Sequence, residues 1–308
     1  MKVSVIIAAY NVEDYIERCI NSVINQSIND IEIIIVNDGS TDNTLEVISR
    51  ISKRDNRISI INQKNQGVMK ARCNGYIKAI GEYILFVDGD DWLREDALEL
   101  LYNKSKKSNC DILCYKFIYI DEEGEERKSH INNDFITFNM IQNDEFLKGI
   151  MLFKVIPSIW SKFIRKKFID DNSIELYNDL KYAEDIVVSC ILGMYNPDVY
   201  MLDDYLYYYY QRRDSVTKVI DYKILDIEKA VNKVKIELNK RNIYYDYKEE
   251  FEYLSFIQNY FERLNLITNF ENKYSKTIYK IWKKYRININ DNKYINNKIS
   301  MQSKGYRV

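Results

Sequence analysis

Residues 83–91 read Tyr83-Ile84-Leu85-Phe86-Val87-Asp88-Gly89-Asp90-Asp91, an apolar run that ends in an acidic turn. A run of this length that stops at a turn is typical of a strand buried on both faces of a sheet. Residues i and i+2 of an extended chain project to one side, with Cα atoms roughly 6.6 Å apart, so Asp88 and Asp90 can face one ion. Their hard oxygen ligands favour Mg²⁺ or Mn²⁺. Taken alone, the motif is also compatible with a solvated acidic turn.

The chain before this stretch repeats the same unit. Further strands are predicted at 2–9, 31–36 and 58–62, and helices at 15–24, about 42–53 and 67–80. Because apolar strands alternate with helices, we predict a Rossmann-like, mostly parallel sheet flanked by helices. Open sheets of this kind bind ligands at the carboxyl ends of their strands. The loops expected to meet there are residues 10–14, 37–42, 65–72 and 88–91.

The chain after this stretch becomes helical towards its C-terminus. Residues 112–120 predict one more strand and 121–133 an exposed connection. From about residue 221 the spacing is helical, with one apolar face made of Ile227, Ala230, Val231, Val234 and Leu238. We therefore expect a domain over 1–220, with a nucleotide-binding half (1–100) and an acceptor half (101–220), and a helical extension over 221–308.

The composition is that of a soluble globular protein. Of 308 residues, 46% are hydrophobic and 30% charged, and no apolar run approaches the ~18 residues of a membrane span. Five cysteines, an odd number, and the lack of a basic and apolar leader favour a reducing, cytoplasmic setting. Cys110 and Cys114 lie four apart, but His130 is the only histidine, so no zinc set is completed.

Charge is unevenly distributed. The net charge is −1, yet residues 273–308 hold ten Lys or Arg against one acid, Asp291. In this segment Ile278, Ile281, Trp282 and Tyr285 interleave with the basic residues, which predicts a basic amphipathic helix. It can dock on an anionic membrane surface, pack on the rest of the chain, or meet a second subunit in a homo-oligomer. No base-reading motif is present, so we expect no nucleic-acid partner.

Two common phosphate-binding motifs are missing. The sequence has neither G-x-G-x-x-G nor G-x-x-x-x-G-K-[ST], so the dehydrogenase and P-loop classes lose their main support. Three other motifs occur instead, in the order Ser4-Val5-Ile6-Ile7-Ala8-Ala9-Tyr10-Asn11, Glu32-Ile33-Ile34-Ile35-Val36-Asn37-Asp38-Gly39-Ser40-Thr41-Asp42 and Asp88-Gly89-Asp90-Asp91.

In this order the motifs resemble the family 2 glycosyltransferases of the GT-A fold. Further matches are Asn65-Gln66-Gly67 with Ala71-Arg72, Trp160-Ser161-Lys162, Glu184-Asp185, and 208–217. The resemblance covers about residues 1–220. It implies a metal-dependent enzyme that moves a sugar from a UDP-sugar to an acceptor hydroxyl with inversion. The acceptor would be a glycan, a lipid-linked sugar or a glycoprotein in the synthesis of bacterial surface polysaccharide or glycoconjugates.

The resemblance also implies a donor site. Tyr10 would stack on the uracil ring, Asp38 would accept a hydrogen bond from its imide N–H, and Arg72 would approach the diphosphate. Asp88 would contact the ribose or the metal, and Asp90 would bind the metal, Mn²⁺ or Mg²⁺. The other implied donor-binding residues are Ala9, Asn11, Glu13, Ser40 and Gly89. Without the family, Tyr10 reads as a core-edge aromatic, Asp38 as a turn former and Arg72 as a solvated helix charge.

The acceptor side is implied by fewer residues. Asp185 would be the catalytic base, and the adjacent Glu184 points in another direction on a helix, so both cannot serve one atom. Acidic residues are favoured in a first helical turn whatever their function, which is the alternative for this pair. Trp160 would form part of an acceptor wall, and Arg212 or Arg213 would close over the phosphates. The alternatives are a core tryptophan and two surface arginines.

Two positions depart from the family pattern, and two rival functions stay open. The family usually has Pro where Ala8 stands and Asn where Cys73 stands, which puts donor selectivity in doubt more than activity. A sugar-nucleotide nucleotidyltransferase is one rival, but its Gly-rich, basic first loop is not present at 10–14. A non-catalytic sugar-nucleotide-binding relative is the other. We expect a cytoplasmic protein, with peripheral membrane attachment if residues 273–308 dock on a bilayer.

Overall fold

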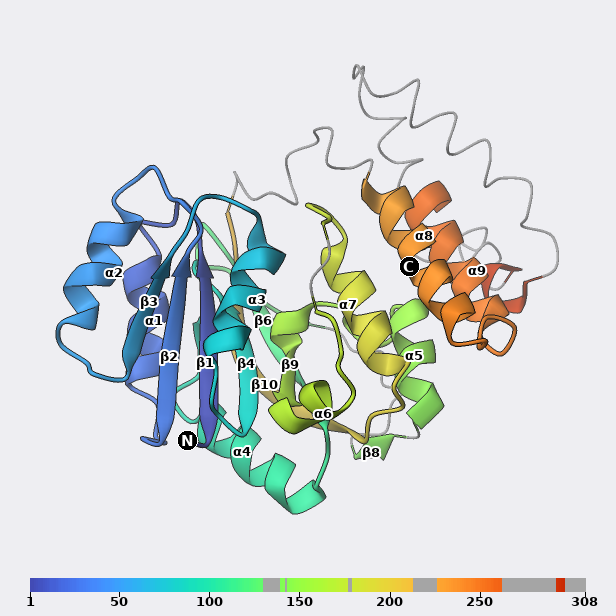
Figure 1. Cartoon of the computed structure of the whole chain (residues 1–308), viewed down its shortest axis with the longest axis horizontal. Coiled ribbons are helices and arrows are strands. Elements are labelled where there is room, and N and C mark those ends of the chain that lie inside the picture. The colour runs from blue at the N-terminus through green and yellow to red at the C-terminus, as the bar shows by residue number, and fades with distance from the viewer. Residues whose placement is uncertain (130–138, 142, 177–178, 213–225, 262–291, 297–308) are drawn as a thin grey trace.

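The computed structural model describes residues 1–129, 139–141, 143–176, 179–212, 226–261 and 292–296. Within these residues one sheet has the strand order β3-β2-β1-β4-β9-β6-β10-β5, with β7 beside β6 and β8 beside β10. The long strands are β1 (Val3–Ala9), β2 (Ile31–Asn37), β3 (Ile58–Asn62), β4 (Tyr83–Asp88), β6 (Ile112–Asp121) and β10 (Val199–Gln211). The short strands are β5 (Trp92–Leu93), β7 (Glu126–Lys128), β8 (Met140–Ile141) and β9 (Lys162–Arg165). Helices flank this sheet (Figure 1).

The first hundred residues form the predicted parallel unit. Strands β1 to β4 pair in parallel. The helices that follow the first three strands are α1 (Ile16–Ile24), α2 (Thr44–Ser52) and α3 (Val68–Lys78). Alternate β1 residues join different core clusters: Ile6 packs with the α3 residue Met69, whereas Ile7 packs with Ile20 of α1 and Ile48 of α2. Helices therefore cover both faces, as the apolar strands predict.

Beyond residue 100 the sheet is mixed rather than mostly parallel. Strand β9 inserts between β4 and β6 and runs antiparallel to both, while β10 is parallel to β6. The predicted exposed connection after residue 121 contains β7, which forms a hairpin with β6. The helices of this part are α4 (Ala97–Ser108), α5 (Asn143–Met151), α6 (Lys166–Asp171), α7 (Glu184–Gly193) and the single 3₁₀ turn η1 (Ile159–Ser161). Local sequence patterns do not specify the direction of a four-residue strand such as β9.

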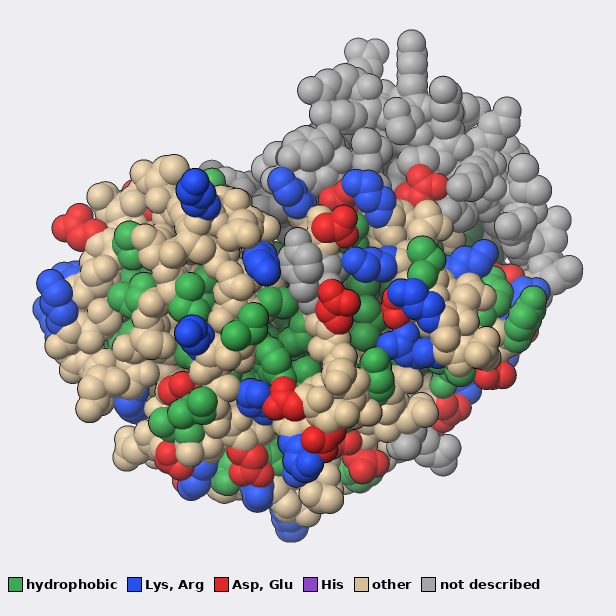
Figure 2. All heavy atoms as spheres, viewed as in Figure 1, with side chains coloured by type: hydrophobic (Ala, Val, Ile, Leu, Met, Phe, Trp, Pro, Cys, Tyr) green, Lys and Arg blue, Asp and Glu red, His purple; other side chains and the backbone are tan. Residues whose placement is uncertain are grey.

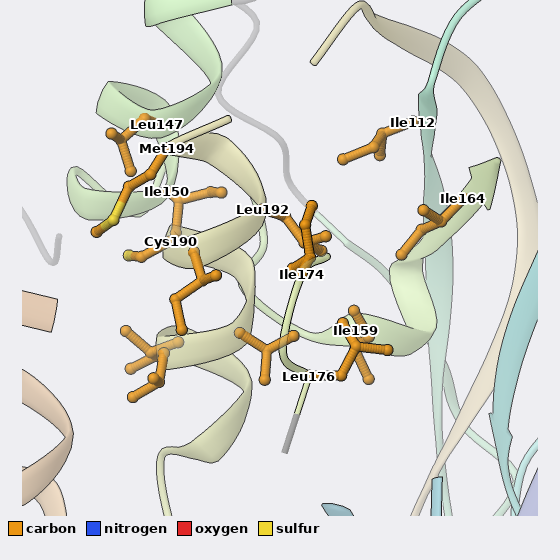
Figure 3. Close-up of a cluster of buried hydrophobic side chains, with 14 of the residues drawn as sticks. Ile112, Leu147, Ile150, Ile159, Ile164, Ile174, Leu176, Cys190, Leu192 and Met194 are labelled. Atoms are coloured by element: carbon orange, nitrogen blue, oxygen red, sulfur yellow. The ribbon is translucent and has the colours of Figure 1, made fainter. Parts of the chain in front are cut away.

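Helix α7 occupies the centre of this half. All of its residues from Ile186 to Gly193 are buried. Its side chains Cys190, Leu192 and Met194 enter a cluster with α5 and with Ile159 of η1 (Figure 3). Because a helix buried on all sides cannot move without disturbing this cluster, the first turn of α7 is a rigid support.

The C-terminal helices share the core of the first 220 residues. They are α8 (Asp226–Lys240), α9 (Lys248–Phe256) and the π-helical turn η3 (Ile257–Phe261). The five predicted apolar positions of α8 are all buried, and Val234, Leu238 and Leu254 belong to the same cluster as α7. A smaller cluster of Phe256, Ile257 and Ile295 lies apart from this shared core.

The predicted basic helix over 273–308 lies outside the described residues except for 292–296. These five residues pack on α9, where Ile295 is buried beside Phe256 and Asn292 donates to the Glu249 carbonyl at 2.7 Å. Along the described residues, no helix is both long enough and apolar enough to cross a bilayer.

Candidate active site

The acidic turn after β4 lies directly against the first loop. The Gly89 amide donates to the Ala8 carbonyl at 3.0 Å. A Cβ at position 89 would come within 3.1 Å of that carbonyl oxygen and of the Val12 side chain. Glycine at this position therefore permits the close approach that brings Asp88 and Asp90 to the carboxyl ends of the strands.

Arg72 of α3 joins this turn to the first turn of α7. Its guanidinium donates to Asp88 Oδ1 at 2.6 Å and to Asp185 Oδ1 at 2.9 Å, and the side chain is only 3% exposed. The Nε atom of Arg72 has no hydrogen-bond partner among the described residues. Burial lowers the pKa of Arg72, but the two carboxylates outweigh burial and raise it. The guanidinium is thus a permanent charge shared by Asp88 and Asp185, which are 97 positions apart in the sequence.

Asp185 and Glu184 begin α7, after Ala183 in the left-handed region at φ 60°. Burial raises the pKa of Asp185, and Arg72 partly offsets this effect. Burial, together with the charge of Asp185, raises the pKa of Glu184 to about 7. A buried carboxylate whose proton affinity is raised, yet which is held by a cation, has the properties of a general base near neutral pH.

Asp90 pairs with the other predicted cation, Arg212. The Arg212 Nε lies 3.0 Å from Asp90 Oδ2, and its Nη1 donates to the Asn11 carbonyl at 3.4 Å. Burial raises the pKa of Asp90 to about 6, although Arg212 lowers it. The end of β10 therefore lies over the acidic turn, as expected of a residue that closes over phosphates. Arg213 lies outside the described residues.

Asp88 and Asp90 suit a metal that is shared with a bound diphosphate. Both supply hard carboxylate oxygens, and burial raises the pKa of Asp90 although Arg212 lowers it. The described residues contain no group of three or more His, Cys, Asp or Glu placed to hold an ion. The two carboxylates are of the ligand type that Mg²⁺ or Mn²⁺ prefers and would hold such an ion only together with oxygens of a bound ligand.

The predicted uracil-binding residues differ in accessibility. Tyr10 is 46% exposed at the end of β1. Asp38 is buried and accepts hydrogen bonds from Gln63 Nε2 at 2.7 Å, the Gln66 amide at 2.9 Å and the Gly67 amide at 2.8 Å. Since a carboxylate has about four acceptor positions, one remains for a ligand. Gln63 was not predicted from the sequence, because nothing in its neighbourhood indicates a partner 25 positions away.

Four other predicted donor residues hold the first two loops together. The Asn11 amide donates to Ser40 Oγ at 3.1 Å, and Glu13 Oε2 accepts from the Asn43 amide at 2.8 Å. Ala9 is buried, and its carbonyl accepts from the Asp38 amide at 2.9 Å. Their observed role is therefore to shape the loops that carry Tyr10 and Asp38.

Trp160 lies behind the acceptor side rather than on its surface. The tryptophan is 6% exposed, and Tyr207 and Tyr209 stack on it with ring centroids 4.6 and 5.4 Å away. Tyr207 also donates to the buried Asp91 at 2.6 Å and accepts from the Asp88 amide at 3.2 Å. Trp160 thus supports β10 and the acidic turn, as in the alternative interpretation of a core tryptophan.

Comparison with known proteins agrees with this geometry. The chain is 32% identical over 220 residues to the uncharacterized glycosyltransferase EpsJ of Bacillus subtilis, covering 70% of this chain and 63% of that protein. It is 32% identical to the cholesterol galactosyltransferase of Borreliella burgdorferi, covering 77% of this chain and 66% of that protein. The chain thus spans somewhat less than two thirds of each relative.

A solved structure shows the same fold. The crystal structure of Staphylococcus aureus TarS 1–349 in complex with UDP-GlcNAc superimposes with a TM-score of 0.73 at 22% identity, covering 92% of this chain and 79% of that one. The family model for glycosyl transferase family 2 matches residues 4–171, which include the loops after β1, β2 and β4. Because that match covers more than half of the sequence, the chain belongs to glycosyl transferase family 2.

Proposed function

We propose that the chain transfers a sugar from a UDP-sugar to an acceptor hydroxyl with inversion of the anomeric configuration. The observation that carries this proposal is the bridge formed by the buried Arg72, which joins the partly buried carboxylates of Asp88, on the donor side, and Asp185, the proposed base. TarS, whose fold the chain shares, has been crystallised with UDP-GlcNAc. A UDP-sugar is therefore the donor class to test first.

We assign the role of base to Asp185, the carboxylate that Arg72 holds. Its carboxylate removes the proton of the acceptor hydroxyl, whose oxygen forms a bond to the anomeric carbon as the bond to UDP breaks on the opposite face. A positioned base of this kind contributes typically ~10²–10⁴-fold to the rate. Arg72 favours the ionised form of the carboxylate, opposing the effect of burial, and fixes its orientation.

The diphosphate leaving group requires positive charge. Asp88 and Asp90 would hold Mg²⁺ or Mn²⁺, which when bound neutralises charge on the diphosphate. Arg212 pairs with the Asp90 carboxylate, and its guanidinium would approach the same phosphates. Tyr10 and Asp38 would bind the uracil by stacking and by the remaining acceptor position of the carboxylate.

The test is a screen for UDP release by the purified chain. UDP-glucose, UDP-galactose and their N-acetyl forms are offered with Mn²⁺ and a panel of glycan, lipid-linked and glycopeptide acceptors, each with an acceptor-free control. We expect one donor to give acceptor-dependent UDP release and a β-linked product. The proposal fails if UTP and a sugar phosphate instead yield pyrophosphate, as in a nucleotidyltransferase, or if UDP-sugars bind without any transfer.

We further propose that the product is a bacterial surface polysaccharide or glycoconjugate and that the enzyme works in the cytoplasm at the inner face of the membrane. On the face drawn in Figure 2, acidic and basic side chains are interspersed, so the basic segment 273–308 is the strongest reason to expect membrane attachment. Co-sedimentation with anionic and neutral vesicles at low and high salt tests it, using the full chain and a chain that ends at Asn272. Equal sedimentation of both chains with anionic vesicles would contradict attachment through this segment.

A further inference from the structure

Side chains donate hydrogen bonds to successive carbonyl groups of the backbone turn that precedes β9. Lys162 Nζ donates to the carbonyls of Ile156 at 2.7 Å and Ser158 at 2.9 Å. Between them, the carbonyl of Pro157 accepts from the Ser189 hydroxyl of α7. Three consecutive carbonyls are therefore fixed by two side chains from different elements.

The next two carbonyls are fixed as well. The Lys162 backbone amide donates to the Ile159 carbonyl, and the Tyr115 hydroxyl donates to the Trp160 carbonyl. The Ile159 side chain is anchored in the cluster beneath α7 (Figure 3). All five carbonyls of residues 156–160 thus have a hydrogen-bond partner, which restrains the turn.

This turn lies against α7, the helix that carries the proposed base. The Ser189 hydroxyl that holds the Pro157 carbonyl lies four positions, about one helical turn, after Asp185. The charged groups that act on Asp185 are Arg72 and Lys162, which favour its ionised form, and Asp88, which opposes it. Arg72 of α3 therefore holds the carboxylate directly, while the turn holds the helix that carries it.

The ammonium of Lys162 is costly to bury. The side chain is 0% exposed, and burial lowers its pKa. Among the described residues no carboxylate lies within ion-pair distance of it, whereas the nearby Lys116 pairs with Asp203. A methionine would fill the same volume without this desolvation penalty. The role of the buried ammonium is therefore to hold the Ile156 and Ser158 carbonyls rather than to add stability.

We propose that Lys162 is a positioning residue for the proton transfer: its ammonium fixes the turn 156–159, which supports α7 and so holds the Asp185 carboxylate towards the acceptor. This inference rests on the proposed function, because it requires Asp185 to be the base. Lys162 itself touches neither substrate nor the reacting atoms.

A double-mutant cycle tests the inference. Lys162→Met should lower kcat by about 10- to 100-fold, less than the loss of the base itself, while the affinity for UDP stays within about twofold. In the Asp185→Asn background the same change should lower the residual rate by less than about threefold, because residues that act through one group are not additive. Lys116→Met is the matched control, a second buried lysine that lies outside the turn, and it should leave kcat within about threefold in both backgrounds.

The outcomes separate the inference from the proposed function. If the wild-type chain transfers sugar and Lys162→Met lowers kcat by the same factor in both backgrounds, or by no more than Lys116→Met does, Lys162 has no positioning role. If the wild-type chain is inactive or Asp185→Asn is fully active, the proposed function fails instead. Should Lys162→Met not fold, Ser189→Ala removes the hydroxyl that holds Pro157 and is carried through the same cycle, with an expected fall in kcat of about 3- to 10-fold.

Discussion

At the scale of single residues, the chemistry depends on which of two adjacent carboxylates, Glu184 or Asp185, removes the proton. Arg72 donates to Asp185, so an amide in its place keeps this hydrogen bond and the shape of the site. We expect Asp185→Asn to lower the rate of transfer by at least about 100-fold while the affinity for UDP changes little. UDP-release kinetics and calorimetry with UDP measure the two quantities.

Glu184→Gln is the matched control, because it makes the same chemical change one position earlier. It should cost less than Asp185→Asn. A larger loss of kcat in Glu184→Gln would assign the base to Glu184 and leave the enzyme class unchanged.

A second residue-scale prediction concerns Asp90. Burial raises its pKa, so a bound cation would favour its ionised form, and that cation would be shared with the diphosphate. UDP should therefore bind more weakly in EDTA than in Mn²⁺, and Asp90→Ala should lose most of this difference. Calorimetry under both conditions measures it.

Asp96→Ala is the control. It removes an exposed carboxylate that lies a few residues after Asp90 and pairs with Arg94, and it should keep the full response to metal. Equal affinity of the wild-type chain for UDP with and without metal would remove the metal from the proposal.

At the scale of elements, periodicity predicts the parts of the fold that are locally encoded. Strands β1 to β4, helices α1 to α3 and the apolar face of α8 follow from runs and spacings in the sequence alone. The short strands β5, β7, β8 and β9 do not, because two to four residues carry no period and their pairing depends on distant partners. For this reason the sequence did not predict the mixed half of the sheet.

The candidate site also has parts that the sequence predicts and parts that it does not. Asp88, Asp90 and Asp185 could be proposed from motifs, but their connection through Arg72 spans 113 positions between Arg72 and Asp185. Trp160 is a different case. Its motif can be recognised in the sequence, but its burial under Tyr207 and Tyr209 depends on how β10 pairs with β6. The role of a side chain in a motif is set by what the rest of the sheet places over it.

At the scale of the whole molecule, the C-terminal helices belong to the same core as α7. Leu238 of α8 is fully buried in that core, whereas Ile236 on the same helix is 53% exposed. Leu238→Ala should lower the free energy of unfolding by about 2–5 kcal/mol, because it leaves a cavity in the shared cluster. Chemical denaturation followed by both circular dichroism and tryptophan fluorescence measures this change.

Ile236→Ala removes a similar volume from the surface of the same helix and should change the free energy of unfolding by less than about 0.5 kcal/mol. The Leu238→Ala chain should still unfold in one transition that both probes report alike. An early transition seen only in the helical signal would show that residues 226–261 unfold as a separate domain.

The guanidinium of Arg72 has a further consequence for the order in which substrates bind. It is divided between Asp88, on the nucleotide side, and Asp185, on the acceptor side. We expect positive charge brought to Asp88 with the nucleotide to compete with Arg72 for that carboxylate and to leave more of the guanidinium to Asp185. The two substrates would then be thermodynamically linked, and whatever factor the first ligand applied to the affinity of the second, the second would return to the first.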